Sequence, residues 1–409
     1  MKKIKRVAEE MVRQLAGEYP VVAVMGPRQS GKTTLCRMTF PEGAYVNLEE
    51  PDERRMAKED PRGFLSRFDG RVILDEVQHV PDLLSYIQSL VDRQEGMGRF
   101  VITGSSNFLL TGQVSQSLAG RVGMLQLLPF CFQELCEATR DTCRQDLFQV
   151  LFAGGYPPIY DREADPVRWL NNYIMTYVER DVRLMLSIQN NDAFLMFLGL
   201  CAGSVGQLLN MARIANDCGV SLNTVKAWLN LLKESYICCT LQPHHANFRK
   251  RLVKTPKLYF YDTGLACRLL RIHAPDQLFA HAMRGALFEN WVVMELMKAR
   301  FNKSLESNLF FWRNSTGLEV DVLFDRGGEL LPLEIKSGKT FVPEWCDSVL
   351  GWKALAGKAG GAASLVYGGD TSMTWKGVRV FPWHGIADCA ALNASTNEPC
   401  WHGHIGKSH

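Results

Sequence analysis

The sequence predicts a multidomain α/β protein that opens with a doubly wound parallel sheet and a phosphate-binding loop. With 409 residues the chain exceeds the usual size of one domain, and two or three domains are expected. An apolar run at 21–25 leads directly into a glycine-rich segment, and a helix-permissive stretch follows. Two later apolar runs, within 71–76 and 99–107, end in polar side chains and alternate with helical segments such as 81–92.

Composition indicates folded domains and gives little information about a partner. Hydrophobic residues make up 46% of the chain and charged residues 22%, which is typical of globular domains. The net charge of +3 is too small to indicate nucleic-acid binding, so any basic surface is local. The 12 cysteines have no metal-ligand spacing, and the basic N-terminus lacks the apolar region of a signal peptide. No apolar run reaches the length of a membrane span, so we expect a cytoplasmic protein without a membrane partner.

The glycine-rich segment at 26–33 fits the pattern G-x-x-x-x-G-K-[ST] of a phosphate-binding loop. Its glycines let backbone N–H groups point at an anion, and the following helix N-terminus adds partial positive charge. Lys32 is expected to reach the β- and γ-phosphates of ATP, and the Thr33 hydroxyl to bind Mg²⁺. For Arg28 a sensor role and a solvated position are both open. The predicted nucleotide-binding residues of this segment are Gly26, Pro27, Arg28, Gln29, Ser30, Gly31, Lys32, Thr33 and Thr34.

Residues farther along the first domain complete a predicted site for ATP hydrolysis. Asp75 is expected to hold Mg²⁺ and Glu76 to orient the attacking water, because both follow the apolar strand at 72–74. The small polar residues after the next strand predict a γ-phosphate sensor, with Ser105, Ser106 or Asn107 as the contact. Arg121 has two open interpretations, an arginine finger acting in cis or across a subunit boundary, and an ordinary surface arginine.

The middle of the chain predicts helices followed by a winged helix. Residues 131–200 are expected to be mostly helical, and helices at 210–215 and 220–229 flank a turn that ends in Gly219. Ser221 is the expected N-cap of the second helix, and a β-hairpin from 236–241 to 256–261 is expected to follow. A basic wing favours contact with a phosphate backbone, although winged helices also serve only for packing. The predicted basic residues of this wing are Arg249, Lys250, Arg251, Lys254 and Lys257.

A second chemical pattern lies at 317–336, where Gly327-Gly328 predicts a tight hairpin turn. In the register that this turn sets, Asp321 lies across from Glu334, and Glu319 lies across from Lys336. These four side chains then share one face, while Val320, Val322, Leu333 and Ile335 form the opposite, core face. Two facing carboxylates are destabilising unless a cation lies between them, and Mg²⁺ is the natural candidate. The alternative is a solvated hairpin face with a Lys–Glu pair.

Two resemblances accompany these patterns. The segments GPRQSGKTT (26–34), LDEVQHVPDLL (74–84), TGSSN (103–107) and LAGRV (118–122) resemble AAA-superfamily ATPases of bacteria and archaea that carry a restriction-endonuclease-like C-terminal domain. GGYPP (154–158) and YVERDV (177–182) are similar to the linker and lid of that family. The D…E-x-K arrangement resembles the PD-(D/E)XK nuclease core. This resemblance implies that Asp321 and Glu334 hold the metal, that Lys336 orients the water, and that Glu289 on a preceding helix is a further ligand.

These expectations divide the chain into an AAA-type P-loop domain at 1–130, a helical lid and winged-helix region at 131–256, a nuclease-like α/β domain at 257–390 and a flexible tail at 391–409. The predicted function is ATP binding and hydrolysis coupled to DNA binding by a homo-oligomer, with Mg²⁺-dependent cleavage as an added activity. The alternative is a nucleotide-dependent switch or scaffold whose nuclease-like fold binds nucleic acid or a partner without cutting it.

Overall fold

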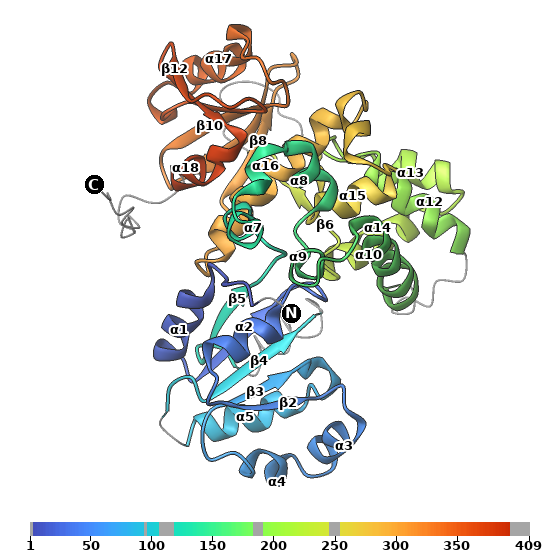
Figure 1. The fold of residues 1–409 in the computed structure, drawn as a ribbon, viewed down its shortest axis with the longest axis vertical. Helices are drawn as coiled ribbons and strands as arrows, with labels where there is room; N and C mark the ends of the chain where they lie inside the picture. The colour runs from blue at the N-terminus through green and yellow to red at the C-terminus, as the bar shows by residue number, and fades with distance from the viewer. Residues whose placement is uncertain (1–2, 94–95, 106–117, 183–190, 245–253, 393–409) are drawn as a thin grey trace.

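The structure is a computed structural model that describes residues 3–93, 96–105, 118–182, 191–244 and 254–392. The first domain forms one end of an elongated molecule, and the two later parts of the chain lie together at the other end (Figure 1). Among the described residues, no helix combines the length and the apolar character needed to cross a membrane.

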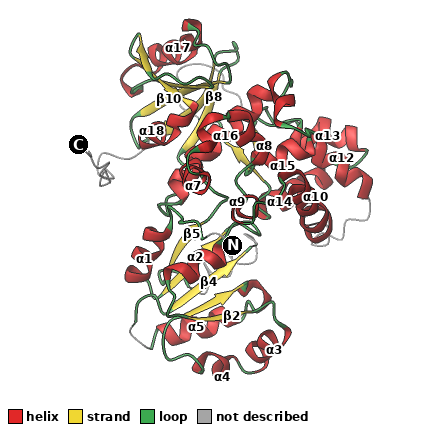
Figure 2. Ribbon diagram, in the orientation of Figure 1, coloured by secondary structure: helices red, strands yellow, loops and turns green. Residues whose placement is uncertain are grey.

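The first domain is a five-stranded sheet in the order β2-β3-β4-β1-β5, in which every neighbouring pair is parallel. This confirms the predicted parallel sheet, because buried apolar strands alternate with covering helices (Figure 2). Strand β2 was missed by the sequence analysis, since its half-exposed residues give no continuous apolar run. The elements are α1 (Glu9–Glu18), β1 (Val21–Met25), α2 (Lys32–Thr39), β2 (Ala44–Asn47), α3 (Pro51–Glu59), α4 (Pro61–Ser66), β3 (Val72–Asp75), η1 (Val77–His79), α5 (Leu83–Val91), β4 (Phe100–Gly104) and β5 (Val122–Gln126).

The middle of the chain is helical up to a two-stranded hairpin, as expected. Gly219 ends α13 at φ 66°, and the Ser221 side chain accepts a hydrogen bond from the backbone N–H of Thr224 at the start of α14. The predicted boundary at 256/257 falls inside the hairpin, because β7 pairs antiparallel with β6. The elements are α7 (Phe132–Thr139), η2 (Thr142–Gln145), α8 (Leu147–Ala153), α9 (Pro157–Asp161), α10 (Pro166–Tyr173), η3 (Ile174–Val182), α12 (Asn191–Ala202), α13 (Met211–Cys218), α14 (Leu222–Glu234), β6 (Cys238–Leu241), β7 (Lys257–Phe260), α15 (Thr263–Leu269) and η4 (Pro275–Phe279).

The last part of the chain is a six-stranded mixed sheet in the order β12-β13-β11-β10-β9-β8. Helices α16 and α17 both contact β10. The short helix α18 lies beyond Trp383, where the sequence showed no periodicity, and the tail from 393 onward lies outside the described residues. The elements are α16 (Arg284–Phe301), β8 (Leu309–Arg313), β9 (Glu319–Asp325), β10 (Leu330–Lys336), η5 (Pro343–Cys346), α17 (Asp347–Ala356), η6 (Gly357–Ala359), β11 (Ser364–Tyr367), β12 (Met373–Trp375), β13 (Val378–Pro382), η7 (Trp383–Gly385) and α18 (Ile386–Ala391).

Near its turn the β9–β10 hairpin has the predicted register, with pairs that run from Leu330–Asp325 to Leu333–Val322. The predicted pairs Asp321–Glu334 and Glu319–Lys336 lie beyond this paired stretch. The predicted core face needs one correction. Val322, Leu333 and Ile335 belong to the large core that includes α16, whereas Val320 packs in a separate core with residues of α17. The neighbouring strand β8 has an irregular register between Phe310 and Trp312 where it pairs with this part of β9. Between these pairs two residues of β9, Asp321 and Val322, lie opposite the single residue Phe311 of β8. The extra residue in β9 reverses the alternation of its side chains, which accounts for the change of face.

Candidate functional site

The phosphate-binding loop lies between β1 and α2, as predicted. A Cβ atom added at Gly26 would lie 2.0 Å from the Leu127 carbonyl oxygen, so only glycine fits against β5 at this position. Gly31 adopts φ 91° immediately before α2, a conformation that glycine reaches without strain. The sequence requirement for glycine at both positions therefore has a steric cause in one case and a conformational cause in the other.

Lys32 is buried inside this loop, where an anion would be needed to balance the charge of its ammonium group. Its ammonium donates hydrogen bonds to the carbonyl oxygens of Gly26 at 3.0 Å and Pro27 at 2.9 Å. Burial lowers the pKa of Lys32, and the nearby carboxylates of Glu76 and Asp75 partly oppose that effect. A bound phosphate would supply the counter-charge that the loop carbonyls provide only in part.

The Thr33 hydroxyl and the Asp75 carboxylate meet at the end of β3. Thr33 Oγ1 donates to Asp75 Oδ2 at 2.8 Å, which places two oxygen ligands of the kind that Mg²⁺ prefers side by side. Thr103 and Tyr45 also donate to Asp75, Tyr45 at 2.9 Å. The sequence analysis missed Tyr45, because a single tyrosine on an unrecognised strand carries no motif.

Glu76 follows Asp75 in a left-handed conformation with φ 55°. Its carboxylate accepts hydrogen bonds from Gln78 and from Ser105, the latter at 3.0 Å. Burial acts to raise the pKa of Glu76, but the Lys32 ammonium and these hydrogen bonds outweigh it, so the pKa lies below its usual value. Glu76 is therefore ionised at neutral pH, as a group that orients an attacking water must be.

The order of the strands explains why Ser105 meets Glu76. Strand β4 lies between β1 and β3, so its carboxyl end faces both the phosphate-binding loop and the two acids. Ser106 and Asn107, the other expected sensor residues, lie outside the described residues.

The remaining predicted loop residues have different surroundings. Gln29 takes a left-handed conformation at φ 63°, Thr34 is exposed on α2, and the Ser30 carbonyl accepts a hydrogen bond from Arg6 at 2.7 Å. Arg28 lies 3.9 Å from Glu49 and over the ring of Tyr177, which belongs to the middle of the chain. Arg28 therefore connects the loop to that region, a role outside both alternatives drawn from the sequence.

Arg121 does not join the nucleotide site of its own chain. It immediately precedes β5, at the amino end of a parallel sheet, whereas the phosphate-binding loop follows the carboxyl end of β1. Its guanidinium pairs with Asp92, with one contact at 3.1 Å. The predicted action of Arg121 in cis is therefore wrong, because Arg121 and the phosphate-binding loop lie at opposite ends of the parallel strands.

A buried arginine near the N-terminus connects the loop to α7, and the sequence analysis missed it. Arg6 donates to Ser30 O at 2.7 Å, to Leu128 O at 2.8 Å and to Glu134 Oε1 at 2.8 Å. Glu134 is fully buried and also accepts from the backbone N–H groups of Val7 and Cys131. Helix α1 starts only at Glu9, and the preceding residues 3–6 have no regular secondary structure and carry the buried Arg6.

The predicted C-terminal acids Glu289, Asp321 and Glu334 lie near one another, and their side chains are largely buried instead of solvated. Glu289 on α16 lies beside Asp321 on β9, and Asp321 Oδ2 accepts from the backbone N–H of Ile335 at 2.9 Å. Glu334 on β10 pairs with Lys336 and accepts from Ser348 on α17 at 2.6 Å. Burial raises the pKa values of both Glu289 and Glu334 to about 7, because ionised carboxylates lose hydration there and Asp321 repels them.

Lys257 supplies the cation of this cluster, which corrects its assignment to the basic wing. Its ammonium lies 2.6 Å from Glu319, 2.9 Å from Glu289 and 3.9 Å from Asp321, and its side chain is only 4% exposed. Tyr259, two residues along β7, donates to the same Glu289 oxygen at 2.6 Å. From the sequence, a lysine in a basic stretch is expected to be solvated. The pairing of β7 in the structure shows that the Lys257 side chain points inward.

The other wing residues give little support for a basic surface. Lys254 is exposed, and Arg249, Lys250 and Arg251 lie outside the described residues.

The two predicted metal sites differ in how well they fit Mg²⁺. At the nucleotide site the Thr33 hydroxyl and the Asp75 carboxylate supply two adjacent oxygen ligands, so the residues fit. In the C-terminal domain the carboxylates already face ammonium and guanidinium groups, and across the described residues no three potential ligands are arranged around a common metal position. The residues there do not fit a metal.

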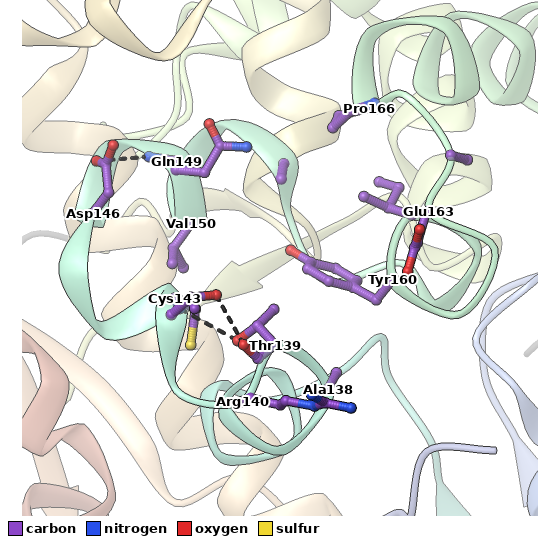
Figure 3. A pocket seen from close by; sticks show the side chains of 14 residues that line it. Ala138, Thr139, Arg140, Cys143, Asp146, Gln149, Val150, Tyr160, Glu163 and Pro166 are labelled. Atoms are coloured by element: carbon purple, nitrogen blue, oxygen red, sulfur yellow. Dashed lines mark hydrogen bonds between the residues drawn. The ribbon is translucent and has the colours of Figure 1, made fainter. Parts of the chain in front are cut away.

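A cavity of about 660 Å³ lies among α7, α8 and α9, apart from both sites (Figure 3). Cys143, Thr139 and Tyr160 line it, and the Cys143 sulfur lies 3.3 Å from the Cys136 sulfur. The hydrogen bond between the two sulfurs lowers the pKa of Cys143 to about 7, although burial opposes the shift. Of the two thiols, Cys143 has the lowered pKa and Cys136 the raised one.

Comparison with known protein families divides the chain into three matched regions. Residues 18–136 match the model of an AAA domain, while residues 144–276 and 284–386 match two domains of unknown function, DUF8612 and DUF4143. A Walker-type ATPase of Pyrococcus abyssi is similar in structure with a TM-score of 0.45 and 16% identity, over 64% of this chain and 94% of that one. The AAA match agrees with the phosphate-binding loop, the Asp75–Glu76 pair and the parallel sheet.

Two relatives match most of the chain. Uncharacterized proteins of Mycobacterium tuberculosis and Mycobacterium bovis are each 32% identical over 343 residues, which cover 82% of this chain and 74% of each relative. This chain therefore belongs to the family of these uncharacterized mycobacterial proteins, and it carries an AAA-type P-loop ATPase domain at its N-terminal end.

Proposed function

We propose that this protein hydrolyses ATP with Mg²⁺ and uses the cycle to change its hold on DNA, which it binds without cutting. The observation that carries the proposal is the nucleotide site, where Lys32, Thr33, Asp75 and Glu76 meet with Ser105. Mg²⁺ held by Thr33 and Asp75 would neutralise charge on the phosphates. Lys32 would bind the phosphates, and the ionised Glu76 would orient the water.

Contacts between the loop and the middle of the chain support coupling. Arg6 touches both the loop at Ser30 and α7 at Glu134, and Arg28 lies over Tyr177. A change in the loop on ATP binding would therefore reach the middle of the chain directly. Partial charges and packed side chains transmit such changes when both ends share a contiguous contact network.

Helix α14 supports DNA as the partner. Asn223, Lys226 and Asn230 are exposed on this helix, while Val225, Trp228 and Leu229 are buried beneath it. The exposed three recur at helical spacing and so share a face. Amide and ammonium groups are suited to base edges and phosphates, and the second helix of a helix-turn-helix is the one that enters the major groove.

ATP turnover and DNA binding by the full-length protein test the proposal. Lys32→Ala should abolish turnover, and unchanged turnover would refute the phosphate-loop assignment. Lys226→Ala with Asn230→Ala should weaken binding of labelled duplex about tenfold or more and lower the salt slope by about 1. Lys58→Ala, at an exposed position of α3, is the matched control and should leave binding unchanged.

Mg²⁺-dependent DNA cleavage is the second candidate, favoured by the ion pair of Lys336 with Glu334 and the nearby Asp321 carboxylate. Incubation of the protein and Mg²⁺ with labelled linear, single-stranded and branched DNA, with and without ATP, distinguishes cleavage from binding alone. Cleavage that disappears in Glu334→Ala would establish the nuclease and overturn the non-cutting proposal. Binding without cleavage, beside intact turnover, supports it.

We further propose that the protein works as a homo-oligomer in which Arg121 completes a neighbour's nucleotide site. Its distance from its own site and its partly exposed guanidinium support this arrangement. Arg121→Ala should then lower turnover at a protein concentration where the wild type is oligomeric, without loss of ATP binding. Equal turnover at all concentrations would refute the role in trans.

A further inference from the structure

We propose that Lys257 is a built-in cation that takes the place of a divalent metal in the C-terminal acidic cluster, defined here as Glu289, Glu319, Asp321 and Glu334. This inference explains the non-cutting role in the proposed function, and it is tested by metal binding, so its outcome does not depend on ATP turnover or DNA binding.

The position of the Lys257 ammonium is the first argument. It lies within 3 Å of carboxylate oxygens from two different elements, Glu319 on β9 and Glu289 on α16, and faces Asp321 as a third neighbour. Mg²⁺ requires oxygen ligands at about 2.0–2.1 Å in octahedral geometry, several of them water. The ammonium and a metal would have to share the same carboxylate oxygens.

The backbone that carries Lys257 is held on both sides, which fixes where the side chain begins, and the two ion pairs then hold the ammonium in the cluster. Strand β7 pairs with β6, where Lys257 lies opposite Leu241, and Lys257 also forms a bridge to Leu208. At the other end of β7, Asn290 accepts from Phe260 N at 2.7 Å and donates to Phe260 O at 2.8 Å. Because Asn290 neighbours Glu289 on α16, these bonds set Lys257 and Glu289 in register.

Further cations satisfy the rest of the cluster. Arg313 pairs with Glu319 at 3.2 Å, and Lys336 pairs with Glu334, whose second oxygen accepts from Ser348. Lys257 also lies 5.6 Å from the centre of the Phe311 ring. Two like charges in a site that excludes water repel strongly, so a divalent ion would bind here only if Lys257 were removed.

Titration with Mn²⁺, followed by the electron paramagnetic resonance signal of the free ion, tests the inference. The full-length protein is used without nucleotide and carries Asp75→Asn, which disables the other predicted metal site. In this reference protein no Mn²⁺ should bind at the C-terminal cluster. Addition of Lys257→Met should create a site for one Mn²⁺ per chain, at least tenfold tighter than any binding by the reference, and Glu289→Gln should abolish it.

Lys336→Met is the matched control, because it removes the cluster's other lysine and leaves Lys257 in place. It should produce no gain in Mn²⁺ binding. A reference protein that binds one Mn²⁺, and loses it with Glu289→Gln, would overturn the inference even if the Lys257→Met protein failed to fold. A folded Lys257→Met protein that binds no Mn²⁺ would overturn it as well.

Discussion

At the scale of single residues, buried charges decide the chemistry of this protein. Lys32 and Glu76 lie within one hydrogen-bonded site, and each shifts the other's protonation toward the charged form. Lys257 does the same for Glu289 in the C-terminal cluster. At the nucleotide site the buried Lys32 has no full counter-charge and can bind a phosphate. In the C-terminal cluster the charge of Lys257 is already balanced by carboxylates.

Glu76→Gln should separate nucleotide binding from hydrolysis. The amide keeps the shape of the side chain but cannot orient or deprotonate water, so turnover should fall about 100-fold or more while ATP affinity is retained. Turnover is measured by phosphate release and affinity by a fluorescent ATP analogue. Arg13→Ala, on the exposed side of α1, is the control. Unchanged turnover would remove Glu76 from the mechanism.

Cys143 should react with iodoacetamide much faster at neutral pH than an ordinary thiol. Its pKa of about 7 makes the thiolate abundant at pH 7, and the alkylation rate should rise through that pH. Cys136→Ala should move the midpoint upward, because the hydrogen bond with Cys136 is the main cause of the shift. Mass spectrometry of the modified peptide checks both results, and a midpoint near pH 9 in the wild type would contradict them.

At the scale of elements, the C-terminal cluster depends on how β7 is attached to α16. The Asn290 side chain is completely buried and bonds both backbone groups of Phe260. These hydrogen bonds join a side chain to a strand and are not part of a sheet, so no strand pattern in the sequence predicts them. It places a lysine from the hairpin of one region among the acids of the next.

Asn290→Ala should lower the free energy of unfolding by about 2–4 kcal/mol. The substitution leaves a buried N–H and a buried C=O without partners, and each such group costs about 1–3 kcal/mol. Urea denaturation followed by tryptophan fluorescence gives the change in midpoint. Asn216→Ala, at an exposed position of α13, should shift the midpoint little. Equal shifts in the two variants would argue against the bridging role of Asn290.

At the scale of the whole molecule, the N-terminal segment before α1 connects the nucleotide site to the rest of the chain. Arg6 is one side chain with contacts in the phosphate-binding loop, in the segment after β5 and in α7. Residues far apart in sequence thus share one buried ion pair. Such a pair is costly to break, because a single partner left behind keeps its charge in a buried site.

Arg6→Ala should weaken ATP binding about tenfold, or about 1.4 kcal/mol, and should remove any effect of DNA on turnover. The loop carbonyl of Ser30 loses its donor, and Glu134 loses its counter-charge. Titrations with a fluorescent ATP analogue, with and without duplex DNA, measure both effects. Arg13→Ala serves as control, since this exposed arginine pairs only with Glu9 among the contacts described. Intact DNA stimulation in Arg6→Ala would exclude this route.

The sequence by itself determined the phosphate-binding loop, the two acids after β3 and the register of the β9–β10 hairpin near its turn. These features depend on local spacing: a glycine pattern, an apolar run with polar residues at its end, and a two-residue turn. Tertiary structure alone decided the position of Lys257, the distance of Arg121 from its own nucleotide site and the reach of Arg6. Each depends on which element lies beside which, and burial of a charge far from its partners in sequence leaves no periodic signal in the chain.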